Sequence, residues 1–85
     1  MTVKFMILQG SQHFLGDASV GLYQVGTDDG GFASFGVGLA GKRYTYRLTV
    51  DEKVDVPDLG ALTLLEVSAG ESRGERGATF GFEEI

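Results

Sequence analysis

The sequence predicts a small all-β domain, either an antiparallel barrel or a compact β-sandwich of about six to eight short strands, with no significant helix. Runs that alternate apolar and polar residues recur along the chain and are bounded by glycine or aspartate. No segment sustains the i, i+3, i+4, i+7 apolar spacing of an amphipathic helix. Because 85 residues have room for one core, we expect a single domain over residues 1–85 whose sheet closes or stacks to cover its edges.

The first part of the chain contains three strand-like runs. Residues 3–8 form an apolar-leaning run that we expect to open the sheet, and a short strand follows around residues 13–15. The third run, residues 18–25, is rich in β-branched and aromatic residues and ends at residues 26–31, Gly-Thr-Asp-Asp-Gly-Gly, which is a strong turn signal.

The clearest strand signal lies in residues 43–50, where aromatic and aliphatic side chains share one face and arginine and threonine share the other. Residues 33–39 alternate in the same way, but their second face carries almost no side chain, and glycine in a strand marks a bend, a bulge or the close approach of another group. Only Ala40, Gly41 and Lys42 separate the two runs. We therefore predict an antiparallel hairpin, which forms a meander with residues 18–25.

The second part of the chain predicts three more strands. Residues 54–56 form a short edge strand that ends at a proline. Residues 61–67 form the next strand, and because the apolar parity changes within it, we expect either a bulge near Leu64 or burial on both faces. Residues 69–77 are polar and glycine-rich, which indicates a mobile loop. Residues 79–84 then close the sheet, with Phe80 and Phe82 directed inward.

Charge and composition limit the kinds of partner. Seven Lys and Arg against 12 Asp and Glu give a net charge of -5, which disfavours nucleic acid as a partner. Cysteine is absent, which excludes disulfides and thiolate metal sites and suits a reducing compartment. The N-terminal apolar run is too short for a signal peptide or a membrane span. We expect a cytoplasmic protein with no cofactor, whose partner is another protein or a second copy in a homodimer.

Two short motifs resemble catalytic or nucleotide-binding signatures. Residues 36–41 match G-x-G-x-x-G, but a strand follows them where a dinucleotide site requires a helix. Residues 70–74 match the G-x-S-x-G of a nucleophile elbow, and Ser72 with the only histidine, His13, would be a small hydrolase's nucleophile and base. The chain is far too short for the hydrolase fold. We therefore expect no catalytic residues. A small hydrolase remains the weakest hypothesis for the function, behind the two non-enzymatic ones given below.

The spacing of the strands resembles that of short actinobacterial all-β domains of unknown function. The likeness covers most of the chain, from Gly16-Asp17 through the strands at 20–25 and 35–39, the stretch Tyr46-Arg47-Leu48-Thr49-Val50-Asp51-Glu52, and residues 56–65 with Val67. The resemblance implies a small β-domain and carries no activity or site residues with it.

Two groups of charged residues are candidate partner-binding sites. Arg43 and Arg47 project from one strand face and suit a carboxylate or an acidic surface. The acidic candidates are Asp28, Asp29, Asp51, Glu52 and Asp55, with Asp58 nearby. They offer oxygen ligands of the type calcium prefers, but not in EF-hand spacing, and aspartate is common in solvated turns.

These observations favour a non-enzymatic protein-binding or assembly module that acts through a sheet face or edge. The alternative is a phage-type or defence-related inhibitor that blocks a host protein with an acidic surface, and it requires the acidic candidates to share one face.

Overall fold

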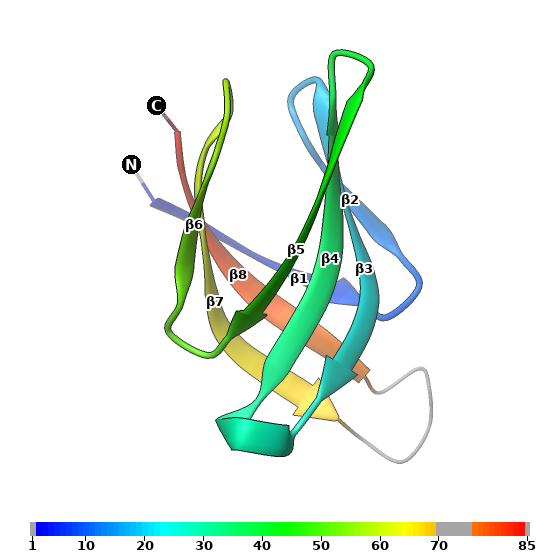
Figure 1. The fold of residues 1–85 in the computed structure, drawn as a ribbon, viewed down its shortest axis with the longest axis vertical. Coiled ribbons are helices and arrows are strands. Elements are labelled where there is room, and N and C mark those ends of the chain that lie inside the picture. Colours follow the sequence, from blue (N-terminus) through cyan, green and yellow to red (C-terminus); the bar gives the residue numbers. More distant parts are fainter. Residues whose placement is uncertain (1, 70–75, 85) are drawn as a thin grey trace.

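The computed structural model describes residues 2–69 and 76–84, which form two four-stranded antiparallel sheets packed face to face (Figure 1). One sheet has the order β1-β8-β7-β6 and the other β2-β3-β4-β5. The strands are β1 (Thr2–Leu8), β2 (Gln12–Leu15), β3 (Ala18–Gly26), β4 (Phe32–Leu39), β5 (Lys42–Thr49), β6 (Lys53–Val56), β7 (Gly60–Ala69) and β8 (Arg76–Glu84). The expected all-β class is confirmed, and of the two architectures the fold is the sandwich, since the sheets do not close into a barrel.

The predicted meander is the β3-β4-β5 part of the second sheet. Its β4–β5 hairpin turns through Ala40 and Gly41, which have φ of 52° and 78°. Positive φ at both central residues is the geometry of a type I′ turn, whose twist matches that of the flanking strands. Residues 36–41 are thus strand followed by turn, and β5 stands where a nucleotide-binding motif would require a helix.

Two bulges adjust the strands to the core. The ladder between β7 and β8 shifts between Leu64 and Glu66, so of the two alternatives expected here the bulge near Leu64 is present. The extra residue, Leu65, lets Leu64 and Val67 both pack on the core although their parities differ. A second shift lies between Leu22 and Gln24, and it leaves the side chain of Tyr23 half exposed on the outer face.

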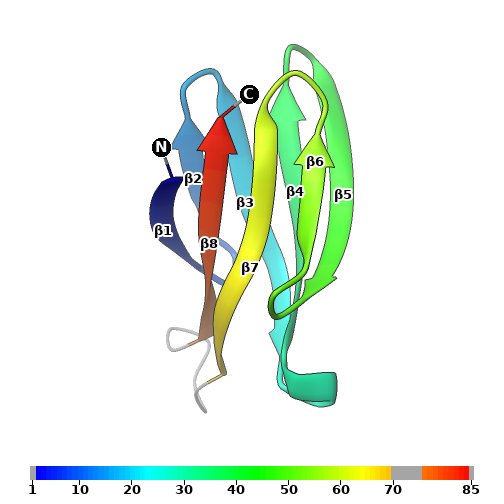
Figure 2. The same ribbon diagram turned by 90° about the vertical axis from the view of Figure 1, so that its left-hand side faces the viewer.

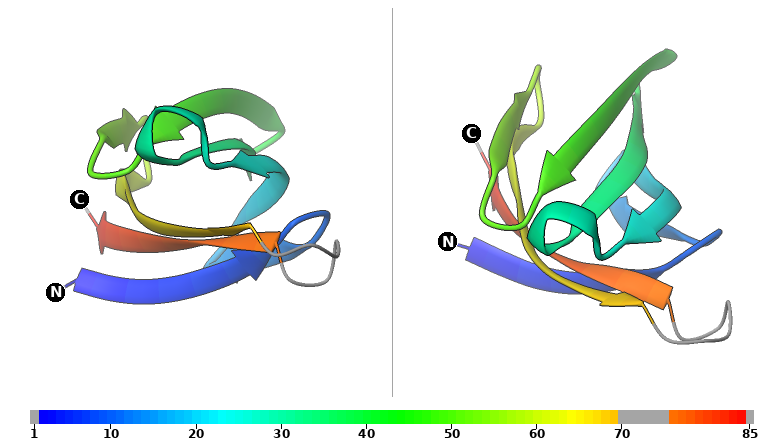
Figure 3. Two further views of the ribbon diagram at one scale, coloured as in Figure 1. Left: turned by 90° about the horizontal axis from the view of Figure 1, so that it is seen from below. Right: turned by 60° about the horizontal axis from the view of Figure 1, so that its bottom comes forward.

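The core lies between the two sheets, which appear as two layers when viewed from one end (Figure 3). Phe35 of β4 and Phe80 of β8 meet there edge to face, with ring centroids 4.9 Å apart, and both are fully buried. The same cluster contains Phe5, Ile7, Val20, Leu22, Val25, Ala33, Val37, Leu48, Val56, Leu62, Leu64, Ala78 and Phe82. Phe80 and Phe82 therefore point inward, as the sequence predicts.

The two ends of the sandwich differ. At one end the chain crosses from β5 to β6, and backbone bonds link Val50 to Gly31 and residues 51–52 to Leu64. The short 3-10 turn η1 (Asp28–Gly30) lies at this end, which we call the closed end (Figure 1). At the opposite end, the open end, the turns between β2 and β3 and between β4 and β5 are neighbours, and the turn between β6 and β7 lies apart from both (Figure 1).

The expected mobile loop at residues 69–77 is wrong at both of its ends. Ala69 pairs with Arg76 and Ser68 with Gly77, so the ladder between β7 and β8 extends into this polar stretch. A polar sequence is compatible with these strand ends because one face of the sheet is open to water. Residues 70–75 lie outside the described part of the chain. No helix within the described ranges has the length and apolar character needed to cross a membrane.

Candidate functional site

The first surface feature is the free edge of β1, where backbone N–H and C=O groups have no hydrogen-bond partner among the described residues. Gln9 donates its N–H to the carbonyl of Arg76 at 2.8 Å, which continues the ladder between β1 and β8. Because peptide groups alternate in direction along an antiparallel ladder, every second residue of β1 then faces away from β8. These edge-facing residues are Thr2, Lys4 and Met6, and no described residue bonds to their backbone N–H or C=O groups.

Apolar side chains lie beside this edge. Met6 is 55% and Leu8 41% exposed, on the outer face of the β1-β8-β7-β6 sheet. Both side chains reach toward Gly77 of β8, where a Cβ would lie 3.1 Å from the Met6 Cε and 3.3 Å from a Leu8 methyl carbon. The absence of a side chain at Gly77 therefore lets them lie over the neighbouring strand, so that the sheet carries an apolar strip next to an unpaired edge.

The other three edges are shorter or more protected. Figure 2 shows β1 and β6 as the two edges of the first sheet. β6 has four residues, carries Lys53 and Asp55, and is followed by proline. β2 also has only four residues, and β5 carries Arg43 and Arg47 along its length. Short strands, charges and proline all discourage strand addition, so β1 is the least protected edge of the described fold.

The second feature is a cleft of about 440 Å³ between the sheets at the open end. Its apolar lining comes from both sheets: Val3, Leu15, Leu39, Leu59 and Phe82. Asp17, Asp58 and Glu84 complete the lining, together with Gly16. These three carboxylates form no ion pair or hydrogen bond with any described residue.

A shallower cavity of about 470 Å³ adjoins this cleft along β6, β7 and β8. It shares Asp58 and Glu84 with the cleft and adds Asp55, Glu83 and Lys53. The pairing of Gly60 with Glu84 and of Ala61 with Glu83 explains the clustering, because it brings the end of β8 beside the turn that carries Asp58. The open end is therefore the place where carboxylates gather.

The third feature is a groove of about 220 Å³ on the outer face of the β2-β3-β4-β5 sheet. Its floor contains Gly21, Gly36 and Gly38, and Tyr23 and Arg43 are among the side chains around it. The Tyr23 ring lies over Gly36, where a Cβ would come within 2.8 Å of its Cζ. Of the three alternatives expected for the glycine-rich face of β4, a bend, a bulge or a close approach, the Tyr23 ring makes the close approach at Gly36.

The two candidate arginines lie on the outer face of β5 and differ in surroundings. The Arg47 guanidinium lies 4.3 Å from the centre of the Phe32 ring, in a cation-π contact. Arg43 borders both the groove and a small hollow at the β4–β5 turn. Arg43 is thus the more available of the two for a partner's carboxylate.

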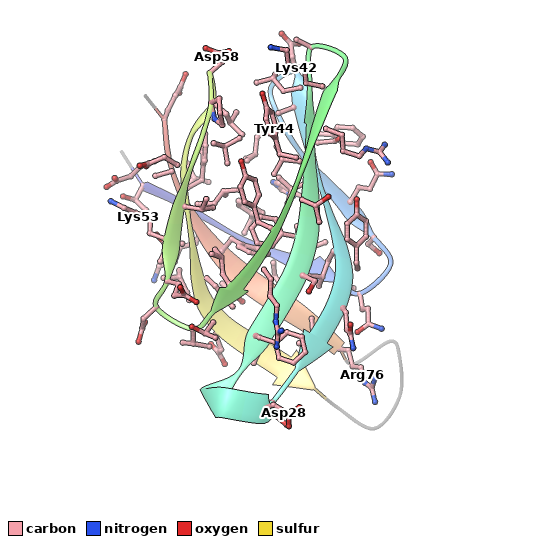
Figure 4. All side chains as sticks on the ribbon, viewed as in Figure 1. Asp28, Lys42, Tyr44, Lys53, Asp58 and Arg76 are labelled. Atoms are coloured by element: carbon pink, nitrogen blue, oxygen red, sulfur yellow. The ribbon has the colours of Figure 1, made fainter. Side chains whose placement is uncertain are left out.

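The acidic candidates do not form one surface. Asp28 lies at the closed end and Asp58 at the open end (Figure 4). Asp51 and Glu52 lie in the crossover at the closed end, and Asp55 is exposed on β6. The side chain of Asp29 lies outside the described part of the structure. The inhibitor hypothesis therefore gains no single acidic face from these six residues.

Glu52 has a local structural role. One carboxylate oxygen accepts hydrogen bonds from the hydroxyl of Thr49, at 2.5 Å, and from its N–H, at 2.7 Å. The side-chain bond, and secondarily the backbone bond, lowers the pKa of Glu52 below its usual value of 4.5. This carboxylate caps the end of the β5 edge.

The described structure does not bring together a catalytic or metal-binding site from the residues that the sequence offers for one. The ring of His13 is half buried and stacks on Phe5 of β1, with centroids 4.3 Å apart and planes 6° from parallel. Ser72 lies outside the described residues. No group of three or more His, Cys, Asp or Glu side chains that could hold a metal ion occurs in residues 2–69 and 76–84.

Sequence reasoning missed Asp17, Glu83 and Glu84, which surround the open end with Asp58. Glu83 and Glu84 follow Phe82 directly in the sequence, which made them appear to be the outward end of a strand. The Pro-Asp-Leu turn at residues 57–59 is the sequence signal for the start of the next strand, and it could have located the two glutamates. Pairing of the strand after that turn with the last strand places the final glutamates beside Asp58.

Comparisons of the chain with models of known protein families, with curated proteins and with solved structures find no match. The fold and surface define the class of protein on their own: an antiparallel β-sandwich with one long edge that carries a single charge, an apolar cleft surrounded by carboxylates and a glycine-floored groove.

Proposed function

We propose that this domain is a non-enzymatic assembly module that pairs with a second copy of itself through the free edge of β1. The observation that carries the proposal is the row of unbonded peptide groups at Thr2, Lys4 and Met6. An exposed edge of this length is a template for another strand, and strand addition is a recurrent mode of protein recognition. The adjacent strip of Met6 and Leu8 adds apolar surface that pairing would remove from water.

Antiparallel pairing of β1 with β1 of a second copy satisfies two-fold symmetry, in which the same surface serves both subunits. One register places Lys4 opposite Lys4 of the second copy, and like charges directly opposite each other destabilise a ladder. In a second register, the two-fold axis passes at Phe5, so that Phe5 lies opposite Phe5 and Lys4 lies opposite Met6 of the second copy. We assign the Phe5-centred register, because there the lysine stem packs on the thioether and the edge-facing groups still meet.

The distribution of charge supports the choice of a second copy as the partner. The chain carries a net charge of -5, so two copies repel each other over most orientations. β1 contains no acidic residue, and its only charge is Lys4. The edge of β1 is therefore a surface on which two acidic copies can approach.

The test is the mass of the protein in solution, measured by light scattering over a dilution series. We expect the mass of two chains at high concentration and of one chain after dilution. Lys4→Pro removes an edge-facing N–H while it leaves the ladder to β8 intact, and proline is tolerated at such a position. This variant should have the mass of one chain at every concentration.

Thr45→Pro is the matched control. Because Val50 bonds to Gly31, the alternation along β5 directs the Thr45 N–H to that strand's free edge. Thr45→Pro should therefore dimerise like the wild type, and far-UV circular dichroism checks that both variants fold. A wild type that stays at the mass of one chain contradicts self-assembly, and loss of the dimer in Thr45→Pro alone would assign the contact to β5.

A further inference from the structure

We infer that the cleft at the open end is a binding site for a lysine- or arginine-bearing apolar peptide segment of a partner protein. This site is separate from the free peptide groups of the β1 edge and does not depend on self-assembly. It would take the cationic side chain of a partner into the space between the sheets, with the chain of that partner lying across the turns at the open end.

The apolar residues that line the cleft are more exposed than core residues of a sandwich usually are. Val3 is 45% exposed, and Leu15, Leu39 and Leu59 are half buried, although their side chains face the space between the sheets. Only Phe82 is covered, at 7% exposed. The core is therefore incompletely covered at this end, and an occupant with an aliphatic portion would remove these groups from water.

The size of the cleft suits a ligand group. Its volume of about 440 Å³ lies in the range of about 300–1,000 Å³ that is usual for ligand pockets. The lining includes residues of both sheets, on β1, β2, β4 and β8 and on the turn after β6. A site built from strand ends of a packed sandwich is positioned by the whole fold.

The charge around the cleft determines the sign of the occupant. Asp17, Asp58 and Glu84 line it, and Asp55 and Glu83 lie in the adjoining cavity. Among the described residues, the only basic one that lines either space is Lys53, which lies in the adjoining cavity and not in the cleft. On the β4–β5 hairpin, Lys42 and Arg43 border a neighbouring hollow, which shares Asp17 and Leu39 with the cleft but adds no basic residue to the lining of the cleft. Lys42 lies at the tip of this hairpin (Figure 4). The cleft is therefore complementary to a cation.

Lysine and arginine combine the two properties that the cleft requires. Each has an aliphatic stem that packs on apolar surface and a charged head that stays near water or a carboxylate. The carboxylates of Asp17, Asp58 and Glu84 have no bond to a described residue, so they are available for charge-assisted hydrogen bonds. A bare metal ion fits less well, because in the described structure no three acidic or histidine side chains converge on one point.

The experiment uses fluorescence anisotropy with a dye-labelled peptide, acetyl-Leu-Lys-Gly-Leu-Arg-Gly, titrated with the full chain. A second peptide replaces both leucines with serine, and a third replaces lysine and arginine with glutamate. We expect the first peptide to bind most tightly, the serine peptide at least about tenfold more weakly and the glutamate peptide not at all. Equal binding of the leucine and serine peptides would show charge attraction without a cleft and would overturn the inference.

Matched protein variants locate the site. Asp58→Asn with Glu84→Gln removes two charges at the cleft, and Asp51→Asn with Asp28→Asn removes two charges at the closed end. Asp58 and Asp51 both have positive φ, 63° and 76°, which asparagine tolerates, so the pairs are matched in backbone as well as charge. The first pair should weaken binding about tenfold or more, and the second should leave it within about twofold.

Each remaining outcome also decides the question. Equal losses in the two pairs of variants, or no binding of the first peptide by the wild type, would overturn the cleft as a site. The Lys4→Pro variant should bind the first peptide as the wild type does. If Lys4→Pro binds the peptide but does not dimerise, the cleft is a binding site whether or not the chain dimerises. If it dimerises but does not bind the peptide, the inference about the cleft is wrong and the proposal about the β1 edge is tested separately.

Discussion

Two glycines on the outer face of the β2-β3-β4-β5 sheet each lie under an aromatic ring. Tyr23 covers Gly36, and Phe32 covers Gly26, its partner in the ladder. The Phe32 ring has the Arg47 guanidinium on it and is only 8% exposed, although it points away from the core. Aromatic rings over glycine pin the register of neighbouring strands. The missing side chains on this face are thus part of its packing.

Gly26→Ala tests this packing. A Cβ at residue 26 would overlap the Phe32 ring, with 2.7 Å to its Cζ, so the ring must leave its position under Arg47. We expect the free energy of unfolding to fall by about 1–3 kcal/mol, measured by urea denaturation. Gly21→Ala on the same strand meets nothing closer than 3.8 Å and should be neutral or slightly stabilising. Equal effects at the two positions would contradict the role of the ring.

Glu52 gives the fold a defined response to acid. Its pKa is lower in the folded chain than the usual 4.5, because its carboxylate accepts bonds from Thr49. The unfolded chain therefore binds this proton more readily, and the stabilisation is present above about pH 4.5 and lost as the pH falls through the lowered pKa.

We expect Glu52→Gln to be less stable than the wild type at pH 7, since the amide oxygen accepts weaker bonds than a carboxylate. The difference should shrink to near zero in acid, which urea denaturation at a series of pH values measures. Asp55→Asn removes an exposed carboxylate that has no bond to a described residue, and it is the control, with a free energy of unfolding at pH 7 equal to that of the wild type. A difference that stays constant with pH would show that the bonds do not depend on charge.

At the level of the elements, three turns contain a non-glycine residue with a positive φ angle, a conformation that some residue types adopt more readily than others. Ala40, Asp51 and Asp58 have positive φ, and only the two aspartates belong to residue types that adopt it readily. Asp58 follows Pro57 in a turn closed by a bond from Leu59 to Val56, the arrangement of a type II turn. Ala40 is the exception, because an alanine there has a conformational cost.

Ala40→Asn should remove that cost. Asparagine followed by glycine is the favoured pair for a type I′ turn, so we expect the free energy of unfolding to rise by about 0.5–1 kcal/mol. Ala40→Val, which places a β-branched residue at positive φ, should lower it. Thermal melts followed by circular dichroism measure both, and a shift in the same direction for the two variants would contradict the turn assignment.

Most of the strands could be predicted from the sequence because alternation is a local property. The strand predicted at residues 43–50 corresponds to β5, Lys42–Thr49, with each end one residue earlier, and the parity change near Leu64 corresponds to a bulge. Both signals depend on which face of a strand is buried. The extension of β7 and β8 into residues 69 and 76–77 could not be predicted this way. They belong to a stretch that is polar and rich in glycine overall, which is typical of a loop, and only pairing between the two strands makes them part of the sheet.

Over the whole molecule, the candidate site depends on contacts that a local pattern does not contain. The sequence marks Asp58 as an acidic turn residue, but its neighbour Glu84 comes beside it only because β8 pairs with β7. The contact of Arg47 with Phe32, a residue of the adjacent strand, also follows from strand pairing and not from the local pattern of β5. The free edge of β1 likewise follows from the order of strands in the sheet, with β1 outermost.

The pairing of Thr2 with Glu83 places the start of β1 and the end of β8 next to each other at the open end (Figure 1). A mechanical load applied between these two points would separate the strands one residue pair at a time, from Thr2 toward Leu8, as a zipper opens. It would not have to break the whole ladder at once by shear. The domain should therefore yield at low force in this direction, and the strand that leaves first is the one proposed to join two copies.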